Sequence, residues 1–303
     1  MSIAQSVPSD DNLFIVDAQM MGQSRYGGLY ILRAPKPTVI ETAFSHTVDQ
    51  ALAALDEVDI APEDVAYIAP THVHMDHAGG AGYLAEACPN AQVLCHHVGA
   101  PHLVDPAKLV KSVARAVGPN FQFYGDMKPV PDDRLISIDD GDRFDLGDGY
   151  AIDVLDTPGH APHHASFYEP KTKGLFTGDA LGIYRPHLAG FQMTTPPPAF
   201  HLEDWLTTHD RLRGLDLDWL YFTHFGPHQD PSGLIDEHER LLREWVAAVG
   251  QALDELDDEQ AVKDRFVEQA DPALKEAYGA EGLRAEVEMN VTGVLLYLTK
   301  HPS

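Results

Sequence analysis

The length and composition of the chain are those of a globular protein. Its 303 residues are 44% hydrophobic and 9% aromatic, which is enough apolar material to build a core and argues against global disorder. The 47 acidic side chains outnumber the 21 basic ones, so the formal net charge is −26. Because such a surface repels phosphate backbones, we expect no nucleic-acid partner.

The acidic charge has two explanations at this stage. It marks either an ordinary acidic protein or an adaptation to high salt, where the Debye length falls to about 3 Å at 1 M and self-repulsion is screened. The scarcity of lysine favours the halophilic explanation. The charge by itself indicates no substrate.

Targeting signals are not apparent in the sequence. The first residues lack a basic and apolar leader, and no apolar stretch approaches the roughly 18–20 residues of a spanning helix. Cys88 and Cys95 are the only cysteines, which argues against a disulfide framework. We therefore expect a cytoplasmic protein with no membrane partner.

In chain order, apolar runs between turn residues predict strands, and apolar residues at helical spacing predict helices. The predicted strands cover 13–19, 28–33, 38–43, 65–70, 91–96, 134–138, 150–157, 164–170, 174–179 and 217–224. The predicted helices in the same part of the chain cover 47–58, 82–88, a segment near 106–117, and 203–213. This order predicts an α/β fold.

The pattern changes after Gly233, where strand signals vanish and the periodicity becomes helical. We therefore predict a domain over 1–232 and a C-terminal helical extension over 233–303, which holds 16 acidic and seven basic residues. Five prolines between 98 and 134 indicate an insertion rather than sheet. Together with the apolar side chains of loop 184–200, this insertion is predicted to form a lid or an acyl pocket.

The motif HVHMDH, residues 72–77, gathers metal-ligand side chains directly after the predicted strand 65–70. On an extended segment His72 and His74 share a face, because side chains alternate along a strand. Asp76 and His77 lie where the chain turns toward a helix, and they can face a second ion beside the first. A lone pair of histidines at this spacing is mostly structural, whereas the full motif after a strand is far more specific.

Three further ligand residues end predicted strands: His160 in TPGH, Asp179 in TGD and His224 in FTH. Functional groups in layered α/β proteins commonly gather at strand ends. The complete set predicts two sites suited to zinc, with manganese and iron as alternatives. The first ion is assigned to His72, His74 and His160, and the second to Asp76, His77 and His224, with Asp179 as a bridge.

These motifs, together with the continuation THFGPH at 223–228, resemble those of the metallo-β-lactamase superfamily, in order across residues 13–228. The resemblance implies an αββα sandwich, an α+β arrangement of four layers, with metals at one edge between two sheets. It also implies two divalent ions per chain and a metal-bridging water as nucleophile. The chain is therefore identified as a superfamily member with a C-terminal helical extension.

The sequence differs from the motifs of two branches of this superfamily, and these differences narrow the range of activities that we expect. Class B β-lactamases carry a cysteine in the second site, and neither cysteine here falls in a ligand motif. Flavodiiron proteins replace the second histidine by glutamate, whereas this chain has His74. The remaining resemblance is to the glyoxalase II and lactonase branches, which implies a dinuclear hydrolase acting on a small-molecule ester, lactone or thioester.

Two alternatives stay open beside a lactone or ester hydrolase. A glyoxalase II-like thioesterase would need basic residues in the extension to hold glutathione, and that extension is acidic. A mononuclear iron oxidoreductase like the persulfide dioxygenases would differ in metal content. A binding module without catalysis is disfavoured because no ligand is missing. The sequence leaves open the substrate, the native metal and whether the protein forms a homo-oligomer.

Two residues are predicted to act in catalysis. Asp76, a carboxylate at the metals, is predicted to relay a proton to the leaving group. Tyr184, five residues after Asp179, is predicted to hydrogen-bond a substrate carbonyl or oxyanion, with a packed loop aromatic as the equal alternative. His163, His164 and His228 lie close to motif residues, and their roles are left open.

Overall fold

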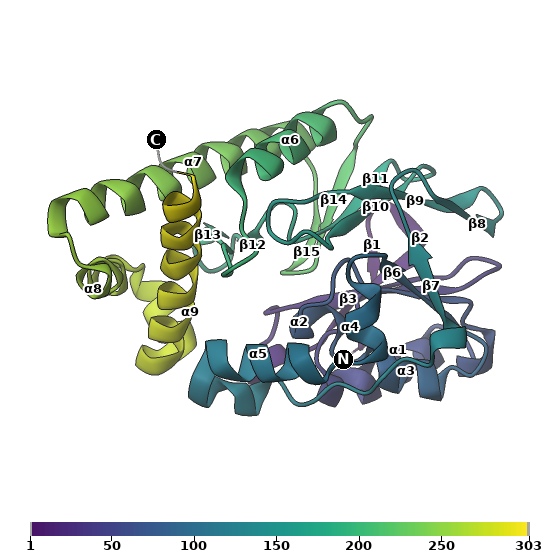
Figure 1. Ribbon diagram of the computed structural model, residues 1–303. Coiled ribbons are helices and arrows are strands. Elements are labelled where there is room, and N and C mark those ends of the chain that lie inside the picture. Colours follow the sequence, from purple (N-terminus) through teal and green to yellow (C-terminus); the bar gives the residue numbers. More distant parts are fainter. Residues whose placement is uncertain (1, 302–303) are drawn as a thin grey trace.

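The computed structural model describes residues 2–301 and has four layers, with further helices at one side (Figure 1). The first sheet contains seven strands in sequential order, antiparallel from β1 to β4 and parallel from β4 to β7. These strands are β1 (Ala4–Val7), β2 (Asp10–Asp17), β3 (Gly28–Leu32), β4 (Thr38–Ile40), β5 (Tyr67–Ala69), β6 (Gln92–His96) and β7 (Leu135–Ile138).

The second sheet contains six strands in the order β15-β14-β11-β10-β9-β8, and a separate two-stranded ribbon pairs β12 with β13. The strands of the second sheet are β8 (Arg143–Gly147), β9 (Tyr150–Asp156), β10 (Ala165–Glu169), β11 (Gly174–Gly178), β14 (Trp219–Phe222) and β15 (Gly226–His228). The ribbon consists of β12 (Ile183–Arg185) and β13 (Gly190–Gln192). Strands β11 and β14 are parallel, and the other neighbours in this sheet are antiparallel.

Helices cover the outer faces of both sheets. The α-helices of the described residues are α1 (Val48–Glu57), α2 (Met75–Ala78), α3 (Ala81–Ala87), α4 (Ala100–Val104), α5 (Ala107–Val117), α6 (Leu202–Arg213), α7 (Pro231–Leu256), α8 (Glu259–Gln269) and α9 (Pro272–Lys300). Of these, α8 and α9 pack with the later part of α7 rather than on a sheet. Short 3₁₀ turns cover Met20–Gly22, Ser45–Thr47, Pro62–Asp64, Gly118–Phe123 and Asp132–Arg134. Within residues 2–301, no helix combines the length and the apolar character needed to cross a lipid bilayer.

Buried apolar side chains fill the space between the layers. The core between the two sheets includes Tyr30, Phe167 and Phe176, which are almost completely buried. Strands β3 and β11 are buried at all five of their residues, because each has a packed layer on both faces. The predicted αββα sandwich with C-terminal helices is confirmed.

The helical end of the chain is joined closely to the sandwich. Helix α7 begins at Pro231, and the Asp230 side chain caps its first turn by accepting a hydrogen bond from the Gly233 backbone N–H, which is 3.1 Å away. Its first part packs on the second sheet through Leu234 and Ile235, whereas its later part belongs to a separate apolar core with α8 and α9. One helix therefore crosses the proposed boundary at residue 232, and the division into two domains stays a prediction.

Candidate metal centre

Four of the predicted ligands come from one short segment after β5. His72 and His74 lie in the loop that follows the strand, and His74 keeps an extended backbone immediately before α2 begins. Asp76 and His77 lie within α2, so the change from extended chain to helix turns their side chains to a different place from the first pair. The motif can thus face two neighbouring positions.

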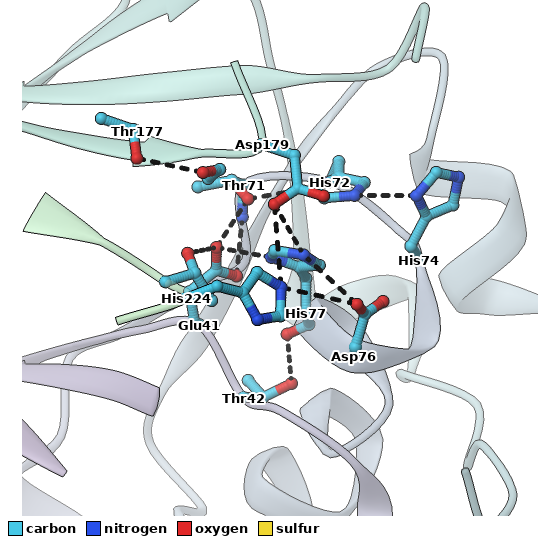
Figure 2. A network of polar contacts seen from close by, with 12 residues as sticks. Glu41, Thr42, Thr71, His72, His74, Asp76, His77, Thr177, Asp179 and His224 are labelled. Carbon is cyan, nitrogen blue, oxygen red and sulfur yellow. Dashed lines mark hydrogen bonds and ion pairs between the residues drawn. The ribbon is translucent and has the colours of Figure 1, made fainter. Parts of the chain in front are cut away.

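The other three predicted ligands follow strands of the second sheet. His160 comes after β9, Asp179 directly after β11, and His224 after β14. The loop of the first sheet and these three strand ends meet at one edge of the sandwich. The structure therefore brings together all seven residues that the sequence assigns to the metals. Figure 2 labels each of them except His160.

The first group consists of three imidazole rings. The Nδ1 atom of His74 lies 2.9 Å from Nε2 of His72 and 2.9 Å from Nε2 of His160. These three ligand atoms lie within 4.8 Å of one another. One proton on His74 cannot be shared well between two acceptors, so the group fits a single bound cation better than a hydrogen-bonded cluster.

The second group contains Asp76, His77 and His224. Oδ2 of Asp76 lies 3.7 Å from Nε2 of His77 and 3.6 Å from Nε2 of His224. Asp179 stands between the two groups, with Oδ1 3.4 Å from Nε2 of His77 and Oδ2 3.6 Å from Nε2 of His160. One oxygen of Asp179 thus faces each group, as a bridging carboxylate requires.

Backbone and side-chain partners fix the position of the ring proton in three of these histidines, His77, His160 and His224. Nδ1 of His160 lies 2.9 Å from the Thr194 carbonyl, and Nδ1 of His224 lies 2.8 Å from the Tyr26 carbonyl. A carbonyl only accepts, so each Nδ1–H donates and each Nε2 presents a lone pair. His77 is held in the same way, because its Nδ1 lies 2.9 Å from the Glu41 carboxylate.

Several buried atoms at this place have no hydrogen-bond partner among the described residues. They are Nε2 of His77, Nε2 of His224 and Oδ1 of Asp179. Buried polar atoms without partners are costly, and these three converge on the same space. The donor set of imidazoles and carboxylates, with oriented rings and orphaned lone pairs, fits divalent ions such as zinc.

The charge states separate His77 from the other rings. Burial tends to lower the pKa of His77, but the carboxylates of Glu41, Asp179 and Asp76 outweigh it and raise that pKa, so a divalent ion at Nε2 would take the place of a proton there. Burial lowers the pKa values of His72, His74 and His160, so these rings are neutral and can act as ligands. Burial tends to raise the pKa of Asp179, but His77 and the other nearby histidines outweigh it and hold that pKa below its usual value. The same balance holds for the pKa of Asp76, which also stays low. Both aspartates are therefore carboxylates at neutral pH.

Glu41 is a buried carboxylate that orients the rings of this site. It was not identified from the sequence. Its Oε1 accepts hydrogen bonds from the hydroxyls of Thr71 and Thr223 at 2.6 and 2.9 Å, and its Oε2 accepts from the Thr71 backbone N–H at 3.2 Å. It also holds Nδ1–H of His77 (Figure 2). Since Thr71 gives its only hydroxyl proton to Glu41, its oxygen accepts from Nδ1–H of His72, 3.1 Å away. One buried carboxylate thus orients a ring in each group.

His164 supports Asp179 and is not a ligand in this arrangement. Its Nε2 accepts the Asp179 backbone N–H at 3.0 Å, and its Nδ1 lies 2.7 Å from the Thr157 hydroxyl. Gly178 has a positive φ of 50°, and a Cβ there would lie 2.5 Å from both His164 Nε2 and Thr71 Oγ1. Glycine is needed before Asp179 because of this close approach.

A cavity of about 240 Å³ opens beside the ligands. Asp76 faces it, with 28% of its side chain exposed against 4% for Asp179. Much of the cavity wall consists of apolar side chains from α5, α9 and the segment 196–199. Parts of both predicted lid regions, 98–134 and 184–200, therefore line the cavity. Two phenols border this cavity, Tyr26 and Tyr124.

The structure does not bring Tyr184 to this cavity. Its ring packs against Phe191, Phe222 and His228, at centroid distances of 4.5, 5.3 and 4.8 Å. Its neighbour Ile183 lines the cavity instead, because alternate residues of β12 point to opposite sides. The alternative of a packed aromatic describes Tyr184, and His228 lies with it rather than with the ligands.

Comparison with known proteins agrees with this geometry. The profile of the metallo-beta-lactamase superfamily matches residues 35–224, and the chain belongs to that superfamily. Its members are mostly metal-dependent hydrolases, and the fold binds divalent metals. The match includes all seven residues of the cluster.

Individual relatives extend this result. The metallo-beta-lactamase fold-containing protein ST1585 of Sulfurisphaera tokodaii is 30% identical over 203 residues, which are 65% of this chain and 72% of that protein. The crystal structure of ST1585 superimposes with a TM-score of 0.71 and 25% identity, covering 94% of this chain and 98% of that one. A hydroxyacylglutathione hydrolase of Ruegeria pomeroyi is 46% identical over 46 residues, only 15% of this chain and 18% of that enzyme.

Proposed function

We propose that the protein is a dinuclear metal-dependent hydrolase that opens an ester, lactone or thioester. One observation carries the proposal: Asp179 directs one carboxylate oxygen to each of two histidine groups at the edge of a cavity. Two divalent ions held there would acidify a water molecule toward neutral pH and polarise a substrate carbonyl. Zinc suits these ligands best, with manganese and iron as alternatives.

Residues of the chain orient the imidazole rings, and Asp76 supplies a proton acceptor. The hydrogen bonds of Glu41, Thr194 and Tyr26 keep the imidazole lone pairs directed at the cavity before any substrate arrives. Asp76 uses Oδ2 toward its two histidine neighbours, which leaves Oδ1 to accept a proton from the attacking water. We assign to this oxygen the transfer of the proton to the leaving group.

The lining of the cavity favours an ester or lactone over a glutathione thioester. Glutathione carries two carboxylates, whereas no lysine or arginine borders the described cavity. The wall contributed by α9 includes Glu286, which offers no positive charge to such a substrate. The short match to a hydroxyacylglutathione hydrolase keeps the thioesterase as the second candidate.

The test combines metal analysis with a substrate panel. The purified protein is assayed for zinc, manganese and iron per chain, and then against lactones, aryl esters, thioesters and phosphodiesters. We expect two ions per chain and turnover of a carboxylic ester or lactone. One tightly held iron per chain, unchanged after incubation with zinc, would favour the mononuclear oxidoreductase and refute the dinuclear assignment.

A further inference from the structure

The metal cavity continues beyond the ligands, between α5 and α9. A smaller cavity of about 130 Å³ shares Tyr26, Tyr124 and Glu286 with it, and a third of about 350 Å³ lies toward α7 and α8. Glu286, on α9, borders all three. In Figure 1 one end of α9 lies beside α5. Glu286 lines the metal cavity together with Leu109 and Val113 of α5, so it lies where the helical end of the protein meets the predicted lid segment.

The carboxyl of Glu286 is only partly used by the protein. Its Oε1 accepts a hydrogen bond from Nδ2 of Asn290 at 3.2 Å. Within residues 2–301, Oε2 has no hydrogen-bond partner and Glu286 makes no ion pair. A carboxyl oxygen on a cavity wall needs water or a ligand to satisfy it.

The nearest buried cation is engaged elsewhere. Arg185 lies between the rings of Tyr26 and Tyr278, with its guanidinium carbon 4.4 and 5.5 Å from their centroids. Its Nη2 donates to Oε1 of Gln192 at 2.8 Å and to the Tyr278 hydroxyl. Glu286 is therefore not held as the ion-pair partner of Arg185, although the two charges influence each other.

The chemistry of the wall limits what can meet Glu286. Burial raises the pKa of Glu286, opposed by Arg185 and supported by Asp76, which favours the neutral carboxyl over the carboxylate. A hydroxyl suits both states, because it donates to a carboxylate and accepts from a carboxylic acid. An ammonium group is disfavoured by the nearby guanidinium of Arg185. The wall contributed by α5 is mainly apolar and includes Leu109 and Val113.

We propose that Glu286 is a specificity-determining residue, which binds a hydroxyl group on the acyl chain of the substrate while the scissile carbonyl lies at the metal ligands. The apolar part of that chain lies along α5. The inference rests on the proposed hydrolase function and assigns its substrate class: hydroxylated acyl esters or lactones rather than plain alkyl ones.

The test pairs substrate changes with enzyme changes. A graded series of ω-hydroxyacyl aryl esters is compared with esters of the same length in which a methyl group replaces the hydroxyl. Both series are assayed with the metal-loaded wild type, with Glu286→Gln and with Glu286→Leu. Glu281→Leu, which removes an exposed carboxylate from the same helix, is the matched control. Metal content and melting temperature show whether each variant is folded.

We expect the wild type to prefer the hydroxylated ester at one or more chain lengths by about tenfold in kcat/KM, mainly through KM. Glu286→Gln keeps most of this preference, since its amide can also accept and donate. Glu286→Leu loses the preference, and Glu281→Leu retains it. Equal turnover of both series by the wild type, or an unchanged preference in a folded Glu286→Leu protein, overturns the proposal.

Equilibrium binding separates this inference from the hydrolase assignment. Calorimetry compares binding of the hydroxy acids and the matching alkanoic acids to the same metal-loaded proteins. A hydroxyl preference that disappears in Glu286→Leu supports the role of Glu286 even if no ester is hydrolysed. If the esters turn over but neither assay shows the preference, the hydrolase stands and the role of Glu286 is refuted. Absence of binding together with absence of turnover refutes both.

Discussion

Asp179 is the residue whose carboxylate contacts both histidine groups. Its oxygens face His77 and His160, and its backbone N–H is fixed by His164. A side chain in this position would neutralise both ions of the proposed dinuclear site at once. Removal of its carboxylate is therefore a stronger test of the site than removal of any single imidazole.

We predict that Asp179→Ala lowers kcat/KM and metal content far more than Tyr184→Phe. A second-sphere partner of a metal site already contributes about 10–100-fold to affinity or activity, and a shared ligand should contribute at least as much. The Tyr184 hydroxyl lies outside the cavity lining, so its loss should change kcat/KM by less than about twofold. Metal analysis and steady-state kinetics of both variants check this. Similar activity and metal content in the two proteins would remove Asp179 from the bridging position.

Glu41 is expected to matter although it reaches no substrate. We predict that Glu41→Gln weakens metal affinity by about 10–100-fold, because an NH₂ group would face the donors of Thr71, Thr223 and His77. Competition with a coloured chelator measures the affinity. Glu63→Gln, at an exposed carboxyl, is the control. Unchanged affinity in Glu41→Gln would show that the ring of His77 is oriented without it.

The clustering of the seven proposed ligands was predictable from the sequence because each lies in a short motif at or just after the end of a strand. Glu41 has no such motif, and its partners Thr71 and Thr223 are 30 and 182 residues away in the chain. Glu286 was equally hidden, since its place on the cavity depends on how α9 packs. Tyr184 was predicted to lie at the cavity but does not line it. Its distance from Asp179 in the sequence did not reveal on which face of β12 its side chain lies.

At the scale of elements, buried strands and long helices were predictable, and strands outside apolar runs were not. Strand β9 is largely buried and matches its predicted range, whereas β8 has only one buried residue and gave no apolar pattern. Strands β12 (IYR) and β13 (GFQ) have three residues each, and neither lies in an apolar run like those that predicted the equally short β4 and β5. Within the predicted helical extension over 233–303, helix α9 begins at Pro272 and includes a non-helical residue at Gly279, so the helical periodicity did not fix the bounds of this element.

The packing of α9 on the cavity loop can be tested with two glycines. A Cβ at Gly293 would lie 1.8 Å from the Thr195 carbonyl oxygen, so Gly293→Ala must displace α9 or the loop that includes Thr194. We expect a fall in melting temperature by several degrees, about 4 °C or more, and reduced activity. Gly250→Ala is the control, because its Cβ would meet only Leu298 Cδ1 at 3.4 Å. There the gain in helix propensity, about 0.5–1 kcal/mol, should leave stability equal or higher. Equal effects of both substitutions would contradict the close contact at Gly293.

At the scale of the whole molecule, the net charge of −26 acts on every folded copy of the chain. Some carboxylates are paired, as in the contacts of Arg213 with Asp210, Asp236 and Glu239. The 21 basic residues are nevertheless too few to neutralise 47 acidic ones. Mutual repulsion among the remaining carboxylates opposes the compact state, and salt screens it.

If the charge is an adaptation to high salt, KCl should stabilise the protein strongly. We predict that melting temperature and activity both rise as KCl increases from about 0.1 M to about 2 M, with most of the gain in the first molar, where the Debye length falls fastest. The measurement must use KCl, since sulfate strengthens apolar burial in any protein. Metal-loaded and metal-free protein are compared, because a rise in both assigns the effect to surface repulsion rather than to the charged site. A melting temperature that stays level or falls over this range would identify an ordinary acidic protein, and it would leave the metal chemistry unaffected.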